Sequence, residues 1–133
     1  MLFAAAAIPL PAADPAGLFV WPKGVPPDKA GAKFSNHSLA LSHRDKDGIP
    51  EVHEKVTDIF VIESGEAQLL LGGYVAGGKT IEPGEIRGGN IRNGMRKNVS
   101  TGDVVHIPPN TPHQFFVPKG KQITYFVVKI SNP

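Results

Sequence analysis

The chain has 133 residues and no cysteine, 41% of its residues are hydrophobic, and its formal net charge is +2 at pH 7. This length suits one domain, and the apolar content is that of a globular protein rather than a disordered one. Without cysteine there are no disulfides or thiolate metal sites. The mild charge has no basic run interleaved with aromatics, which argues against a nucleic-acid partner.

Residues 1–13 are apolar, rich in alanine and uncharged. They are too few to span a bilayer as a helix. They resemble the end of a secretory signal peptide, with Ala12 and Ala13 near the cleavage point. We therefore expect an exported protein, periplasmic or secreted, with a loose arm on a cytoplasmic protein as the open alternative. No membrane partner is expected for the rest of the chain.

Residues 14–34 form a proline-rich arm that contains Pro15, Pro22, Pro26 and Pro27. Prolines at this density forbid a regular helix. The segment 18–21 is predicted to be a short edge strand or an arm that packs on a partner subunit. Residues 35–133 are predicted to form one β-barrel domain.

The rest of the chain is typical of short strands separated by turns. Residues 36–43 alternate as a strand does, and 45–50 are turn-forming. The runs 58–63 and 66–71, joined by Ser64-Gly65, predict a hairpin, and 77–102 predict a long loop with one short strand around 79–81. The last predicted strands are 104–108, 114–117 and 122–130. This pattern favours an all-β sandwich or barrel.

Two stretches carry a family resemblance. The first contains Glu51, His53 and Asp58 and closes at Gly65; the second runs from Gly102 through Pro108 to His113. They resemble the two conserved motifs of the cupin superfamily, a His-x-His pair followed by Glu and Gly, and a Gly-Pro-Gly-His series. The resemblance covers about residues 36–130 and implies a single-domain cupin, a jelly-roll barrel also called a double-stranded β-helix.

The resemblance also implies a metal site with a degenerate first motif. The family's ligands carry over onto His53, Asp58 and His113, with Glu51 in place of the first histidine and Asp58 in place of the glutamate. Carboxylate and imidazole groups both bind divalent cations, so one Mn, Fe, Ni or Zn ion is the expected cofactor. Glu51 is assigned as a ligand or as the catalytic base.

Four further residues are candidates for the wall of a substrate pocket. They are Phe60, His106, Phe115 and Tyr125. Core packing would explain the aromatic ones equally well, and a hydrogen-bonded position on the barrel flank would explain His106. A basic cluster could clamp an anion or face solvent; it comprises Arg87, Arg92, Arg96 and Lys97.

The sequence thus predicts a metal-dependent enzyme acting on a small polar organic molecule by dioxygenase-, isomerase- or lyase-like chemistry. Because a fold does not fix function, the alternative is a non-catalytic cupin that binds a small ligand or serves as a metal-stabilised sensor or partner module. A third and weaker hypothesis is a structural barrel that binds no metal. The resemblance to the cupin superfamily also implies a homodimer.

Overall fold

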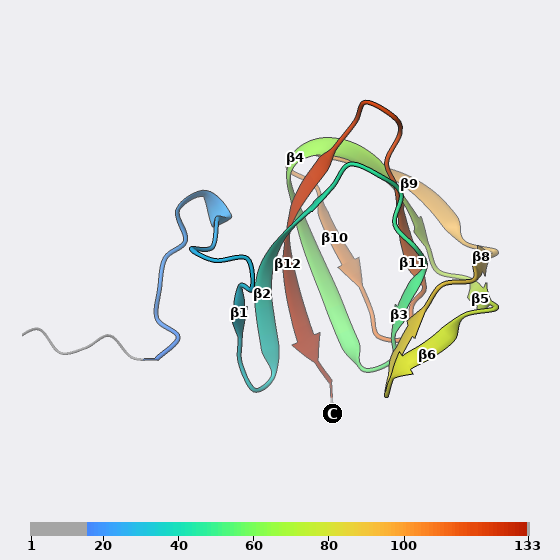
Figure 1. Cartoon of the computed structure of the whole chain (residues 1–133), viewed down its shortest axis with the longest axis horizontal. Helices are drawn as coiled ribbons and strands as arrows, with labels where there is room; N and C mark the ends of the chain where they lie inside the picture. The colour runs from blue at the N-terminus through green and yellow to red at the C-terminus, as the bar shows by residue number, and fades with distance from the viewer. Residues whose placement is uncertain (1–15, 133) are drawn as a thin grey trace, which may run out of the picture.

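The computed structural model describes residues 16–132, which form one short 3-10 helix and twelve β-strands (Figure 1). The elements are η1 (Pro22–Gly24), β1 (Ala32–Lys33), β2 (His37–Arg44), β3 (Glu51–His53), β4 (Val56–Leu71), β5 (Tyr74–Ala76), β6 (Lys79–Glu82), β7 (Glu85–Arg87), β8 (Asn90–Arg92), β9 (Met95–Ser100), β10 (Val104–Ile107), β11 (His113–Phe116) and β12 (Ile123–Ser131). No helix within the described range is long and apolar enough to cross a membrane.

The strands form one curled antiparallel sheet around the long strand β4, and a separate β5–β8 pair lies at its side (Figure 1). The main sheet runs β1-β2-β12-β4-β11-β3-β7-β6, with β9 and β10 also paired to β4. The first part of β4 pairs with β10 and β12, and its last part pairs with β9 and β11. This one strand therefore joins both faces of the barrel, as the all-β jelly-roll prediction requires.

The predicted hairpin within 58–71 is wrong, because the chain passes through Ser64-Gly65 without reversing. Gly65 has a φ of +81° and pairs with Ile123, and the register of the two strands shifts close by, between Thr124 and Tyr125. A glycine in this conformation bends a strand as readily as it closes a turn. The bend lets β4 move from one side of the barrel to the other.

The segment 77–102 also differs from its prediction. It contains strands β6, β7, β8 and β9 rather than a long loop with one strand. All four residues of β6 are exposed, and in β9 only Val99 is buried. Strands that bury so little leave no apolar alternation in the sequence, so the periodicity could not indicate them.

The core fills the interior of the barrel with apolar side chains from several strands. Its most buried members include Ile62 and Leu69 on β4 and Ile123 on β12. The inner face of β2 is different, because it presents the small residues Ser38, Ala40 and Ser42. These short side chains do not fill the interior at this level, and a pocket remains there.

The proline-rich arm packs on its own barrel. The Trp21 ring meets the Phe126 ring edge-on at 6.1 Å, and Phe19 stacks on Trp21 at 4.7 Å. Residues 18–21 are not a strand, and Val20 is 85% exposed. The homodimer expected through this arm stays a prediction. Residues 1–13, the expected signal-peptide remnant, lie outside the described residues.

Candidate metal site and its pocket

Three candidate ligands converge inside the barrel. Glu51 and His53 alternate on β3 and therefore share a face, and His113 on β11 pairs directly with Glu51 across the two strands. One ligand atom from each of these three residues lies within 4.8 Å of the others. His53 and His113 are buried and Glu51 is half-buried, so the structure contains a candidate Glu/His/His metal site.

His53 is oriented by a carboxylate on the neighbouring strand. Its Nδ1 lies 2.8 Å and 2.9 Å from the two oxygens of Glu85, which in turn accepts a hydrogen bond from Arg87 at 2.9 Å. A carboxylate only accepts, so Nδ1 carries the hydrogen and Nε2 of the neutral ring presents a lone pair to the interior. This carboxylate–histidine pairing is the usual support of metal-binding histidines.

His113 is held in the equivalent way by the main chain. Its Nδ1 donates to the carbonyl oxygen of Thr111 at 3.0 Å, which leaves the Nε2 lone pair facing inward. Nε2 has no hydrogen-bond partner, and neither has the buried Oδ2 of Asp58, 3.4 Å away. Two facing lone pairs away from water are costly unless a positive group lies between them.

Asp58 opens the inward face of β4 and is 1% exposed. Its Oδ2 lies 3.1 Å from Nε2 of His53, and its Oδ1 accepts a hydrogen bond from the Lys129 ammonium at 2.8 Å. Burial raises the pKa of Asp58, but His53 and Lys129 outweigh it and hold the pKa below its usual value. Burial lowers the pKa of His53, but Asp58 and Glu85 outweigh it and raise that pKa.

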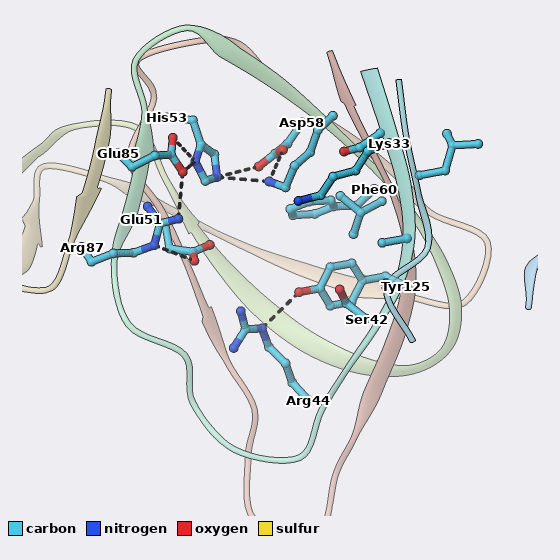
Figure 2. Close-up of a pocket in the computed structure, with 16 residues that line it drawn as sticks. Lys33, Ser42, Arg44, Glu51, His53, Asp58, Phe60, Glu85, Arg87 and Tyr125 are labelled. Carbon is cyan, nitrogen blue, oxygen red and sulfur yellow. Dashed lines mark hydrogen bonds and ion pairs between the residues drawn. The ribbon is translucent and has the colours of Figure 1, made fainter. Parts of the chain in front are cut away.

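Glu51 is paired with Arg87, whose Nε lies 3.1 Å from Oε1, while Oε2 lies 3.6 Å from Nε2 of His113. Burial opposes ionisation of Glu51. The neighbouring His113 and Arg87 outweigh that effect and lower the pKa of Glu51 to about 2. This carboxylate is therefore charged at neutral pH and presents one oxygen to the interior (Figure 2).

Glu51, His53 and Asp58 line a pocket of about 360 Å³, a volume that suits a small organic molecule, whereas His113 is not among its lining residues. Phe60 and Tyr125 line it, with ring centroids 4.9 Å apart. Phe115 is buried behind them, 5.6 Å from Phe60 and 4.7 Å from Tyr125. Figure 2 shows Arg44 and Tyr125 at the end of the pocket opposite His53 and Asp58.

The predicted site residues do not all lie here. The structure brings Glu51, His53, Asp58 and His113 together, and places Phe60 and Tyr125 on the pocket wall. His106 lies outside the pocket, contrary to its place among the pocket candidates, because its β10 neighbours Val105 and Ile107 take the inward positions and leave it exposed. Of the basic cluster, Arg87 enters the pocket and Arg96 lies outside it over the Phe116 ring.

Sequence reasoning missed three residues that shape the site. In the pairing of β3 with β7, Glu85 lies opposite His53 and Arg87 lies opposite Glu51. Each of the two strands therefore carries a glutamate and, two residues later, a basic residue. Lys129 and Arg44 both lie at inward positions of strands, and Lys129 shares its face of β12 with the buried Tyr125 and Val127. A charged residue at an inward position was the available signal in both cases.

The donor set fits a divalent cation. The inward Nε2 atoms of His53 and His113 and a free oxygen of Glu51 are the nitrogen and oxygen donors that such ions take, and the unpartnered Oδ2 of Asp58 faces the same space. Asp58 is not one of the three residues whose ligand atoms cluster within 4.8 Å, although its Oδ2 lies beside both imidazoles.

Comparison with known proteins shows the fold. No protein-family model and no curated protein sequence matches the chain. The chain is similar in structure to a conserved double-stranded β-helix protein of Klebsiella pneumoniae, with a TM-score of 0.58 and 15% identity over 89% of this chain and 92% of that one. It is also similar to a cupin protein of Bacteroides fragilis, with a TM-score of 0.52 and 13% identity over 74% and 68% of the two chains.

A third similar structure is the DMSP lyase DddQ of Ruegeria pomeroyi, with a TM-score of 0.53 and 15% identity. The match covers 74% of this chain but only 40% of the lyase. At these identities the likeness is one of fold. The chain therefore has the small, single-domain cupin double-stranded β-helix fold, with a candidate Glu/His/His metal site inside it.

Proposed function

We propose that this cupin binds one divalent transition metal through His53, His113 and Glu51, with Asp58 beside them, and acts as a metal-dependent enzyme on a small polar organic molecule. The observation that carries the proposal is the pair of buried, unpartnered atoms, Nε2 of His113 and Oδ2 of Asp58, 3.4 Å apart. A cation between them removes the cost of two facing lone pairs. The similarity to a lyase is in keeping with lyase-like chemistry.

A bound divalent metal would supply Lewis acidity at its open positions, polarising an oxygen of the substrate or lowering the pKa of a bound water. The chain's own residues then have separate roles. Glu85 holds the His53 ring, Thr111 holds the His113 ring, and Arg87 keeps Glu51 ionised. A carboxylate with a pKa of about 2 is a weak base, so the ligand role of Glu51 is better supported than the role of catalytic base.

Metal analysis tests this proposal. The purified protein is incubated with Mn²⁺, Fe²⁺, Ni²⁺ or Zn²⁺, desalted and analysed for metal per chain. We expect wild type and His106→Ala to retain metal and His113→Ala to lose it while keeping the β-sheet circular dichroism signal. His106 is the matched control because it is an exposed histidine on a barrel strand. Equal metal content in both variants, or none in wild type with any of the four ions, would refute the site.

One observation favours a second function, that of a non-catalytic cupin. The Lys129 ammonium lies 2.8 Å from Oδ1 of Asp58 and 3.3 Å from Nε2 of His53, so the chain carries a cation of its own at the edge of the site. A pocket neutralised in this way can hold a small ligand without a metal. Binding of the same small molecules to metal-free and metal-loaded protein, without turnover in either, would support this second function.

A further inference from the structure

We propose that Arg44 and Tyr125 form a carboxylate-binding site at the end of the pocket opposite the candidate metal ligands, so that the molecule bound there is a small organic acid. This inference rests on the proposed function and names its substrate class. Four observations carry it: an arginine without an anion, a buried hydroxyl with a hydrogen to donate, the charge balance of the pocket wall and the shape of the space between the two ends.

Arg44 has no carboxylate partner. Arg87, the other arginine of the pocket, is within 3.1 Å of both Glu51 and Glu85, whereas no carboxylate of residues 16–132 lies within ion-pair distance of Arg44. Its Nε donates to the Tyr125 hydroxyl at 3.1 Å, and its guanidinium lies over the Phe115 ring, 5.6 Å from the centroid. A half-buried guanidinium with unused Nη donors favours an anion from outside the chain.

The guanidinium is also held in place. The backbone at Gly48 packs so closely that a Cβ there would lie 3.1 Å from one Nη of Arg44. The Gly48 segment is itself fixed to β11, because its amide donates to the carbonyl of Phe115 at 2.9 Å and its carbonyl accepts from Gln114 at 3.0 Å. Arg44 is therefore a positioned donor rather than a free surface chain, and binding loses little of its side-chain freedom.

Tyr125 supplies the second donor. Its hydroxyl accepts the hydrogen bond from Arg44, and its own hydrogen is shared between the neighbouring Ser42 hydroxyl and an oxygen of a ligand in the pocket. The side chain is 4% exposed, and burial raises the pKa of Tyr125, which keeps the phenol protonated. The pair thus presents N–H and O–H groups side by side, as a carboxylate requires.

The charge balance of the pocket wall points to the same ligand. Four lining side chains are basic and three are acidic, namely Lys33, Arg44, Arg87 and Lys129 against Glu51, Asp58 and Glu85. Arg87 and Lys129 are neutralised by partners within the site, and Lys33 is exposed at its edge. Without the exposed Lys33 the wall is neutral overall, with three basic groups against three carboxylates, but all three carboxylates lie beside Arg87 or Lys129 and none pairs with Arg44. A divalent cation at the other end would make the pocket positive overall and favour an anionic ligand.

The arrangement defines a ligand that spans the pocket. Figure 2 shows Arg44 and Tyr125 at one end, His53 and Asp58 at the other, and Glu51 between them. The volume of about 360 Å³ leaves room for an acid of a few carbons. One carboxylate would contact the Nη groups of Arg44 and the Tyr125 hydroxyl, while a second polar group faces the candidate metal ligands.

Calorimetric titration tests the inference with oxalate, malonate, succinate and glutarate on Zn²⁺-treated protein, and with 1,4-butanediol as the uncharged counterpart of succinate. We expect saturable binding of at least one acid and none of the diol. Arg44→Gln should weaken that acid about 10- to 100-fold, the effect of losing a charged hydrogen-bond donor. Tyr125→Phe should weaken binding of the acid about 2- to 10-fold. This second variant still tests the site if Arg44→Gln does not fold.

Arg96→Gln is the matched control, because Arg96 also lies over a phenylalanine ring, 4.3 Å from the Phe116 centroid, but outside the pocket. It should leave acid binding unchanged. Equal affinity of wild type and Arg44→Gln, or no saturable binding of any of the four acids, would overturn the carboxylate site. Metal uptake that depends on His113 would survive that result. Conversely, Arg44-dependent acid binding by a protein that takes up no metal would refute the proposed function and keep the carboxylate site.

Discussion

The Lys129 ammonium lies 2.8 Å from Oδ1 of the buried Asp58, while Oδ2 of the same carboxylate is left facing two imidazoles. One side of Asp58 is thus satisfied by a side chain that is 42% exposed, and the other side is not satisfied by any donor. The ammonium and a metal ion are both cations that this carboxylate attracts, so they compete for it.

Lys129→Met should therefore have opposite effects on the two forms of the protein. It removes the ammonium but keeps an unbranched apolar stem. The metal-free protein should lose about 2 kcal/mol of unfolding free energy, because a charged hydrogen bond to Asp58 disappears. The affinity for Zn²⁺ should rise by about tenfold or more, because the ion no longer competes with Lys129. Chemical denaturation in EDTA and metal competition titrations measure the two effects.

Lys121→Met is the comparison variant, since Lys121 is paired with Glu66 at 2.6 Å on the surface, outside the pocket. Exposed pairs contribute little, so this variant should change neither quantity measurably. An unchanged Zn²⁺ affinity in Lys129→Met would show that the ammonium does not compete with the metal.

The second prediction concerns Glu85, which contacts no candidate metal position and acts through His53. Glu85→Gln keeps a side chain of the same shape but removes its negative charge. That charge fixes the hydrogen on Nδ1 of His53, which lies 2.8 Å from Oε1 of Glu85. Loss of such a supporting carboxylate should lower metal affinity about 10- to 100-fold. The ¹⁵N chemical shifts of the His53 ring should also change, because its tautomer is no longer fixed.

Glu82→Gln provides the control for this experiment, because Glu82 is an exposed residue of the adjacent strand β6. It should leave both the metal affinity and the His53 spectrum as in wild type. Identical affinities in the Glu85 and Glu82 variants would mean that Glu85 does not position His53.

The limits of prediction from this sequence are visible within single strands. His53 and His113 could be singled out by the resemblance to the cupin motifs, and both side chains are buried in the structure. His113 shares its face of β11 with the buried Phe115, whereas β3 shows no alternation, because Val52 is buried as well as His53. Their supporting partners could not be placed. Glu85 and Lys129 are 32 and 76 residues from His53, and only the pairing of strands brings them within hydrogen-bond reach.

The same reason explains the error over β4. The sequence around Ser64-Gly65 is compatible with a turn and with a bend, since both use a glycine at positive φ. The choice depends on whether β12 lies alongside to pair with the bend, and this is a long-range contact. For His106 the sequence left two positions open, the pocket wall and the barrel flank, and the structure has it on the flank, because Val104 and His106 form the outward face of β10.

A third prediction follows from the low pKa values of the site carboxylates. A carboxyl group whose pKa is lower in the folded than in the unfolded chain stabilises the fold above its unfolded pKa and loses that contribution as the pH falls. The pKa of Glu51 is about 2 in the folded protein. In EDTA, wild type should therefore be about 2 kcal/mol more stable than Glu51→Gln above about pH 5, and this difference should vanish toward about pH 2.

Denaturant unfolding at a series of pH values measures this difference, with Glu54→Gln as the comparison because Glu54 is an exposed glutamate in the turn after β3. Glu54→Gln should track wild type across the series. A stability difference between wild type and Glu51→Gln that stays constant from neutral to acid pH would contradict an ionised, stabilising Glu51.

The fourth prediction tests the bend that carries β4 between the two sides of the barrel. Gly65 and Gly102 both have positive φ, +81° and +92°, so alanine is strained at either position. Their surroundings differ: a Cβ at Gly65 would overlap the carbonyl oxygen of Gln122, whereas one at Gly102 would meet nothing within 4 Å. Gly102→Ala should thus cost about 1 kcal/mol, the strain alone, and Gly65→Ala at least about 2 kcal/mol more. Because Glu66 also donates its amide to Gln122, relief of this overlap would break the ladder next to the bend. Equal unfolding free energies for the two variants would mean that β4 does not pass Gln122 as closely as this fold requires.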